Sequence, residues 1–376
     1  REGIPLAKNS VLKFDSFNYG EEFGDANYAD NQILSCAKDL HRKGFNSTLV
    51  SQDINLRLRA KSVGVEAVSY GKEKTTIDEI YSGLVTIKDE RTGILLKEHQ
   101  GIDCYENSTL KSLYPNQCVL FKDENDKNVA YGRRIKDDKI KFVNQTKAWG
   151  ISARNMEQAM ALDLLMDPSV PLVSLAGKAG CGKTILCMAA GLELVAALKQ
   201  YKKVIIYRPI QAVGNDIGFL PGDIQEKLEP WMGAIKDSME ILAPSYSKGH
   251  NKNNNNSRSK PQQNSWKNAL VQFGDQIELE AITYIRGRSI SNSFILLDEA
   301  QNLSKEEMKT ILTRIGMGSK IVITGDVEQI DNSKLDALNN GLSYIIDKFK
   351  SSNLAGHISL KEGERSPLAE EAAKIL

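Results

Sequence analysis

From residue 149 onward, short apolar runs alternate with longer segments in which apolar residues recur at helical spacing. The apolar runs lie at 171–176, 203–207, 293–297 and 320–324. Each run is apolar at successive positions, which is typical of strands whose two faces are both covered by helices. The pattern therefore predicts an α/β fold with a parallel sheet.

The first 148 residues divide into two segments with different patterns. Residues 1–75 alternate between helical and strand-like stretches, including a helix that opens at Asp30 and a short apolar strand at 48–51. Residues 76–148 contain short β-type runs separated by polar turns. We therefore expect a small α/β domain, then a β-rich connector, then a main domain at 149–376.

The α/β pattern is interrupted between residues 243 and 274. This segment includes four consecutive asparagines at 253–256 and several lysines and arginines, but no acidic residue. Such a biased polar stretch inside a domain is typical of a surface loop. We predict a mobile insertion here.

Overall charge excludes a general affinity for polyanions, because 49 lysines and arginines balance 48 aspartates and glutamates. Any nucleic-acid site must therefore be a local patch. The five cysteines form no CxxC pair and no zinc-type cluster, which indicates reduced thiols in a cytoplasmic protein. No apolar run approaches the ~20 residues of a membrane span, and no signal peptide is evident, so no membrane partner is expected.

A glycine-rich segment links the apolar run at 171–176 to an apolar helical stretch from Ile185. It comprises Gly177, Lys178, Ala179, Gly180, Cys181, Gly182, Lys183 and Thr184. Strand, glycine-rich loop and helix together form the context in which backbone N–H groups and a helix N-terminus hold phosphates. We expect Lys183 to reach the β- and γ-phosphates of ATP and Thr184 to ligate Mg²⁺. An incidental glycine-rich turn is the alternative, which the flanking strand and helix disfavour.

Two adjacent carboxylates, Asp298 and Glu299, follow the apolar run at 293–297. Because carboxyl ends of parallel strands meet at one edge of a sheet, both should lie beside the glycine-rich loop. Asp298 is placed to hold Mg²⁺, and Glu299 to orient and deprotonate the attacking water. Taken alone, the pair would also suit a helix N-cap.

Two glutamines are further candidates for contact with the nucleotide. Gln329 follows the apolar run at 320–324 within Gly325-Asp326-x-x-Gln329, where its amide could sense the γ-phosphate. Gln158 precedes the first strand of the core, and its amide could read the adenine edge as both donor and acceptor. The alternative for Gln158 is an exposed residue at the start of a helix.

The three linked motifs resemble motifs I, II and III of superfamily 1 helicases. Other segments resemble PhoH-like ATPases, namely 208–210, 216–223, 283–289 and 363–366. This resemblance covers 149–376 and implies a RecA-like P-loop core in an ATP-dependent motor that unwinds RNA and binds single-stranded RNA. It also implies a homo-oligomer, with a ring as one form.

No second RecA-like domain follows the core, so a neighbouring subunit would have to complete the site. Arg365 is the first candidate for the arginine that stabilises γ-phosphate charge, and Arg286 and Arg288 are the next. For each of them, a surface salt bridge is the alternative.

Residues 1–75 resemble part of a PIN nuclease domain, which holds Mg²⁺ or Mn²⁺ with four acidic residues. Asp30 and Asp53 match the third and fourth of these acids. The places of the first two would lie before Arg1, so we expect weak nuclease activity or none. Helix capping is the alternative role for both aspartates.

Nucleic-acid contacts are expected from basic and aromatic residues, namely Arg208, Arg286, Arg288, the lysines of the insertion, Trp149, Trp231 and Trp266. For Trp149 and Trp231, a place in the core or an interface is the alternative. Two other functions stay open beside an RNA motor. One is a ribonuclease regulated by ATP, and the other is a nucleotide-switched RNA-binding scaffold without unwinding activity.

Overall fold

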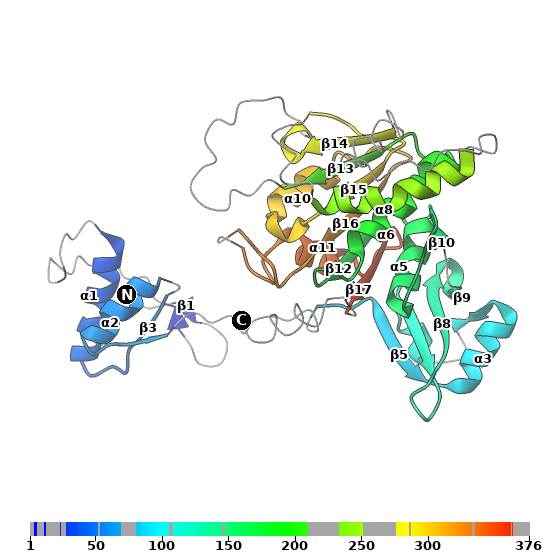
Figure 1. Cartoon of the computed structure of the whole chain (residues 1–376). Helices are drawn as coiled ribbons and strands as arrows, with labels where there is room; N and C mark the ends of the chain where they lie inside the picture. The colour runs from blue at the N-terminus through cyan, green and yellow to red at the C-terminus, as the bar shows by residue number, and fades with distance from the viewer. Residues whose placement is uncertain are drawn as a thin grey trace. The chain divides into compact units, whose positions relative to one another are not determined.

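The computed structural model of the chain divides into two compact units, residues 1–74 and 75–376 (Figure 1). Each unit has its own buried apolar core. The structure describes residues 4–5, 11–12, 23, 28–51, 53–68, 80–104, 108–144, 147–209, 233–250, 276–285, 287–332, 335–361 and 363.

A six-stranded parallel sheet forms the centre of the second unit, as the apolar pattern predicted. Its strands are ordered β14 (Ile277–Ala281), β13 (Val204–Arg208), β15 (Phe294–Leu297), β16 (Lys320–Gly325), β12 (Leu172–Gly177) and β17 (Ala355–Leu360). The four predicted runs form the four inner strands. The sequence pattern missed the two edge strands, because β14 alternates with glutamates and β17 contains histidine and serines.

Helices cover both faces of this sheet (Figure 1). One face packs against α5 (Met156–Met166), α6 (Lys183–Leu192), which continues into the π-helical turn η4 (Glu193–Ala197), and α8 (Gly233–His250). The other face packs against α10 (Lys305–Leu312) and α11 (Gly341–Phe349). Successive strand residues alternate between the two cores; Ile206, for example, faces the first and Ile205 the second.

The helix α8 changes the expectation of an insertion at 243–274. Its backbone stays helical as far as His250, so the first part of that segment belongs to a helix and not to a loop. Residues 251–274 lie outside the described part of the chain. Within the described residues, no helix has the length and apolarity that crossing a membrane requires.

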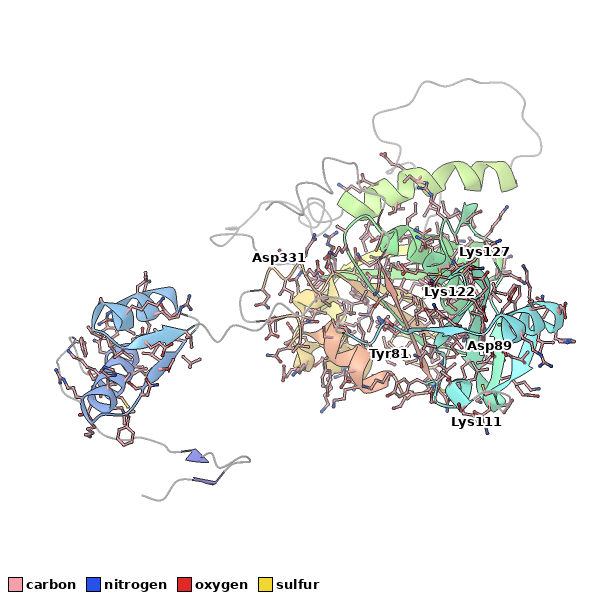
Figure 2. All side chains as sticks on the ribbon, turned by 90° about the horizontal axis from the view of Figure 1, so that it is seen from below. Tyr81, Asp89, Lys111, Lys122, Lys127 and Asp331 are labelled. Atoms are coloured by element: carbon pink, nitrogen blue, oxygen red, sulfur yellow. The ribbon has the colours of Figure 1, made fainter. Side chains whose placement is uncertain are left out.

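The predicted β-rich segment contains a second, mixed sheet. Its strands are ordered β5 (Leu84–Lys88), β7 (Cys118–Lys122), β8 (Asn128–Ile135), β9 (Lys139–Phe142) and β6 (Gly101–Asp103). The helix α3 (Glu90–His99) packs on this sheet, and α4 (Ser108–Lys111), η3 (Lys136–Asp138) and the hairpin β10 (Lys147–Ala148) with β11 (Ile151–Ser152) complete the segment. Lys122 and Lys127, labelled in Figure 2, flank the turn between β7 and β8.

A buried ion-pair network joins this second sheet to the main core. The guanidinium of Arg133, on β8, binds the carboxylates of Asp163 on α5 and Asp167 just after it. Arg133 also donates to Asn116 Oδ1 over 2.8 Å, and the amide of Asn116 donates to the backbone carbonyl of Ala355 at the start of β17. Residues 75–376 are therefore held together by polar contacts as well as by apolar packing.

The first unit is small. Its elements are β1 (Ile4–Pro5), β2 (Val11–Leu12), α1 (Ala29–Arg42), β3 (Thr48–Val50), α2 (Ile54–Ser62) and β4 (Glu66–Val68), with β3 and β4 paired in parallel. Leu34, Leu49 and Leu56 are among the residues of its core. The Asp53 carboxylate accepts the backbone N–H of Leu56 over 3.0 Å and so caps α2.

Candidate functional site

The carboxyl ends of four neighbouring strands meet at one edge of the parallel sheet. Arg208 ends β13, Gly177 ends β12 and Gly325 ends β16, while Asp298 directly follows β15. The strand register brings these ends together, because Tyr207 pairs with Leu297 and Ala176 pairs with Gly325. The structure thus gathers the three motifs that the sequence placed far apart.

The glycine-rich loop has the backbone that a phosphate-binding loop needs. Gly180 and Gly182 have φ values of 84° and 89°, in the left-handed region that favours glycine. A Cβ atom on Gly177 would lie 2.5 Å from the carbonyl oxygen of Leu360 on β17 and 2.8 Å from Cys181 Sγ. The helix α6 begins at Lys183, so its N-terminus points into the loop.

In this structure, the groups expected to bind phosphate bind other protein atoms. Lys183 Nζ donates to the backbone carbonyls of Gly177 (2.6 Å) and Lys178 (3.0 Å). The backbone N–H of Ala179 donates to Asp326 Oδ2 over 3.1 Å. Burial raises the pKa of Asp326. A phosphate entering the loop would have to replace these contacts.

Asp298 is suited to holding a cation. Its residue is 2% exposed, and Thr324 Oγ1 donates to its Oδ1 over 2.6 Å. Its Oδ2 atom is buried without a hydrogen-bond partner among the described atoms. Burial raises the pKa of Asp298, and the neighbouring charge of Glu299 raises it further. A divalent cation would satisfy the orphaned oxygen and stabilise the charged form.

Glu299 is held by one residue of its own motif, Gln301, and by one from another strand, Arg208. Its backbone is left-handed, with a φ of 57°. Gln301 Nε2 donates to Glu299 Oε2 over 2.6 Å, and Arg208 NH2 lies 3.5 Å from Glu299 Oε1. The two adjacent carboxylates therefore share one arginine, whose NH1 lies 3.9 Å from Asp298 Oδ2.

Gln301, for which no role was expected from the sequence, links the second and third motifs. Besides Glu299, its amide nitrogen donates to the backbone carbonyl of Gln329 over 2.9 Å. Its amide oxygen accepts the backbone N–H of Asp326 over 3.1 Å. The residue is fully buried, so the protein and not solvent supplies the partners of its amide. In the sequence, the signal for this role was the presence of an amide side chain two positions after the predicted base.

Gln158 is buried, so its alternative role as an exposed helix-start residue is wrong. Its Oε1 accepts the backbone N–H of Arg154 over 2.9 Å, and its Nε2 donates to the backbone carbonyl of Cys181 over 3.2 Å. It borders a hollow of about 560 Å³ that Ile151, Ile185 and Ile241 also line. This hollow lies beside the glycine-rich loop and has the apolar walls that suit a nucleobase.

The structure describes some of the other predicted contacts. Arg288 donates to Glu280 Oε1 over 2.8 Å, the salt bridge given as its alternative role. Trp149 donates its ring N–H to the backbone carbonyl of Leu242 over 3.2 Å and packs against the core. Arg286, Arg365, Trp231 and Trp266 lie outside the described residues. Gly363, however, lies beside the loop, since a Cβ atom there would be 3.7 Å from Ala179 O.

The two candidate acids of the first unit differ in their contacts. Asp53 caps α2, the alternative considered for it, while Asp30 is exposed in the first turn of α1. Among the residues that the structure describes, no group of three or more His, Cys, Asp or Glu side chains could hold a metal ion.

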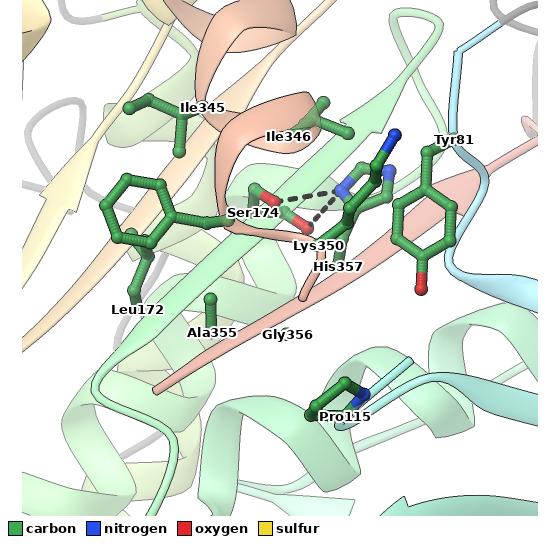
Figure 3. A pocket seen from close by; sticks show the side chains of 11 residues that line it. Tyr81, Pro115, Leu172, Ser174, Ile345, Ile346, Lys350, Ala355, Gly356 and His357 are labelled. Carbon is green, nitrogen blue, oxygen red and sulfur yellow. Dashed lines mark hydrogen bonds between the residues drawn. The ribbon is translucent and has the colours of Figure 1, made fainter. Parts of the chain in front are cut away.

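A second hollow lies toward the opposite edge of the sheet (Figure 3). Leu172 and Ala355, which begin their strands, line it together with Tyr81 and His357. Its volume is about 10 Å³, room for about one water molecule and not for a substrate. His357 is buried there, with Nδ1 2.9 Å from Ser174 Oγ.

The sequence matches two families. Residues 150–376 match the PhoH-like protein family, and residues 7–71 match a PIN domain. Protein PhoH2 of Bacillus subtilis is 39% identical over 392 aligned residues, which cover 100% of this chain and 85% of that protein. Protein PhoH2 of Mycolicibacterium smegmatis is 34% identical, over 92% of this chain and 74% of that protein.

Among solved structures, Pif1 helicase from Candida albicans is 16% identical with a TM-score of 0.29. The match covers 60% of this chain and 43% of the helicase, so this chain spans less than half of that protein.

Proposed function

Because the chain belongs to the PhoH-like protein family and carries a PIN domain at its N-terminus, we propose that it is an ATP-hydrolysing motor acting on single-stranded RNA. The observation that carries this proposal is the glycine-rich loop beside Asp298 and Glu299. Gln301 connects this pair to the segment from Asp326 to Gln329. A site built only to bind a nucleotide would not need such a relay from the base.

Each part of the site has a role in this proposal. Lys183 and the loop N–H groups bind the phosphates and stabilise the charge that develops on them. Thr184 and Asp298 would hold Mg²⁺, which neutralises charge on the phosphate oxygens. Glu299 orients a water molecule and takes its proton, and Gln301 reports the state of Glu299 to Gln329.

Assembly and RNA binding are further parts of the proposal. Among the residues that the structure describes, one six-stranded sheet carries a glycine-rich loop of this kind, and we expect a second copy of the chain to supply the further positive charge at the γ-phosphate. Arg365 remains the candidate, and Gly363, two residues before it, lies beside the loop. We therefore expect a cytoplasmic homo-oligomer, with a ring as one form.

The first test measures ATP hydrolysis with and without single-stranded RNA. Glu299→Gln should keep nucleotide affinity while lowering turnover by at least about 100-fold, because it removes the base. Lys183→Ala should lower both the nucleotide affinity and the turnover. The matched control is Glu306→Gln, which changes an exposed glutamate in the first turn of α10 and should match the parent. A hydrolysis rate indifferent to RNA would contradict the motor, and a tailed duplex that stays paired would favour the scaffold.

A ribonuclease regulated by ATP is the second candidate, favoured by the PIN domain match at residues 7–71. The informative change is Asp53→Asn, because asparagine caps a helix as well as aspartate does but is a poorer metal ligand. RNA cleavage that survives Lys183→Ala and disappears in Asp53→Asn, at unchanged thermal stability, would establish this second function. Cleavage that persists in Asp53→Asn would exclude Asp53 as a ligand.

A further inference from the structure

The predicted base, Glu299, is held on both sides. Gln301 Nε2 donates to Oε2 over 2.6 Å, and the Arg208 guanidinium lies 3.5 Å from Oε1. The two partners of Glu299 differ in burial and in how firmly they are bonded. Gln301 is fully buried and bonded at both ends of its amide, whereas the Arg208 side chain is 22% exposed.

The position of Arg208 follows from the strand order. Arg208 ends β13, which lies next to β15, and Tyr207 pairs with Leu297. The side chain at the end of one strand therefore reaches the two carboxylates that follow the other strand. The guanidinium is a counter-charge that the protein itself places beside Asp298 and Glu299.

This ion pair works against the proposed task of Glu299. Arg208 and Gln301 together occupy both oxygens of the Glu299 carboxylate, so a water molecule that is to give up its proton there has to compete with them. The 3.5 Å separation is longer than a direct charge-assisted hydrogen bond. The arginine fork is therefore not fully used, and a better anionic partner can compete for it.

A phosphate diester is such a partner, since the planar fork of arginine matches two phosphate oxygens at once. We propose that Arg208 is a positioning residue that restrains Glu299, and that it releases Glu299 when a backbone phosphate of single-stranded RNA binds its guanidinium. This inference rests on the proposed RNA-dependent hydrolysis. It makes RNA binding the event that frees the base.

The decisive variant is Arg208→Gln, measured with oligouridylate as the RNA. We expect its RNA-free turnover to rise several-fold and its stimulation by RNA to fall close to one-fold. The affinity for a fluorescent ATP analogue, measured by anisotropy with Mg²⁺, should stay unchanged, because Arg208 contacts Asp298 and Glu299 and is assigned no contact with the nucleotide. Arg208→Lys, which keeps the charge but loses the fork, should show partial stimulation.

Lys203→Gln is the matched control. Lys203 directly precedes the same strand and binds Glu278 over 2.7 Å, so the change also removes a basic partner of a carboxylate, at the opposite end of β13. Its turnover and RNA stimulation should equal those of the parent. Equal thermal midpoints for all three variants would show that they fold alike.

Several results would overturn the inference. Lower RNA-free turnover with weaker analogue binding in Arg208→Gln would mean that Arg208 contacts the nucleotide. Unchanged turnover and stimulation would mean that the ion pair has no role. A raised turnover with full RNA stimulation would overturn the release by RNA. If the parent did not hydrolyse ATP with or without RNA, the proposed function would be refuted. If Arg208→Gln then hydrolysed ATP while the parent did not, the restraint of Glu299 by Arg208 would still be supported.

Discussion

Two buried polar side chains of the parallel sheet, Lys320 and His357, are hydrogen-bonded within the protein. Lys320 is fully buried, and its ammonium donates to the backbone carbonyls of Leu164, Asp167 and Val170 over 2.7–2.9 Å. His357 is buried between β12 and β17, where Nδ1 lies 3.0 Å from the carbonyl of Ser174 and Nε2 lies 3.1 Å from Ser359 Oγ. Three acceptors suit a charged lysine, whereas one acceptor and one hydroxyl suit a neutral histidine.

His357 should make stability depend on pH. Burial lowers its pKa to about 4, against about 6.5 in an unfolded chain. Between these values the unfolded chain binds a proton that the folded protein does not, so stability present above pH 6.5 is lost as the pH falls toward 4. The loss should be about 3 kcal/mol at most. Urea unfolding at several pH values measures it.

The variant His357→Gln should lose this part of the acid sensitivity, and the exposed His99→Gln should keep it. An acid profile of His357→Gln that overlies the parent's would show that folding does not change the pKa of His357.

At the scale of elements, the ion pairs of Arg133 join β8 to α5. We expect Arg133→Met to lower the free energy of unfolding by about 3–5 kcal/mol, because the buried Asp163 would keep only Lys141 as a charged partner and the half-buried Asp167 would lose its guanidinium. Chemical denaturation measures this loss. Arg91→Met, an exposed arginine on α3, is the control and should change stability by less than about 0.5 kcal/mol. A similar small effect for Arg133→Met would mean that water replaces the guanidinium.

Among the strands of the parallel sheet, some could be predicted from the sequence and others could not. The inner strands are apolar on both faces, so their composition alone identifies them. The edge strand β14 contains Glu278 and Glu280, which bind Lys203, just before the neighbouring strand β13, and Tyr207 within it. Such polar edges look like loops until the pairing is known. The helical stretch predicted from Ile185 is the α-helix α6 as far as Leu192, after which the chain continues as the π-helical turn η4.

The candidate site likewise has a part that could be predicted from the sequence and a part that could not. The loop from Gly177 to Thr184 is contiguous, so its chemistry is legible from residue types and spacing. The contact between Arg208 and Glu299 is not, because it depends on β13 lying beside β15. The relay through Gln301 depends likewise on β16 being the next strand in the sheet. Tertiary register, and not local sequence, creates both contacts.

At the scale of the whole molecule, the two units have separate cores. The apolar cluster of the first unit involves residues 23–67, and the clusters of the second begin at Ile80. We therefore expect a fragment of residues 75–376 to fold cooperatively and to keep the ATP turnover of the full chain within about two-fold. Calorimetry and a hydrolysis assay test this.

The informative contrast is a fragment that begins at residue 149, which removes β8 and with it Arg133. This shorter fragment should unfold more readily, because Asp163 and Asp167 lose their partner. A fragment of 75–376 that aggregates or loses turnover would show that the first unit supports the ATPase.

The close approach of Gly177 to Leu360 has a consequence for how such sequences diverge. The first glycine of the loop, Gly177, is required for two reasons: phosphate binding and packing against β17. A side chain at this position would collide with β17 whether or not a phosphate is bound. A descendant that had lost hydrolysis would be free to drift at Lys183 and Glu299, yet selection for folding would still preserve Gly177. A distant homologue that retains this glycine therefore shares the fold and its descent, but it need not hydrolyse ATP. Retention of the lysine and the glutamate is the better indication that activity has survived.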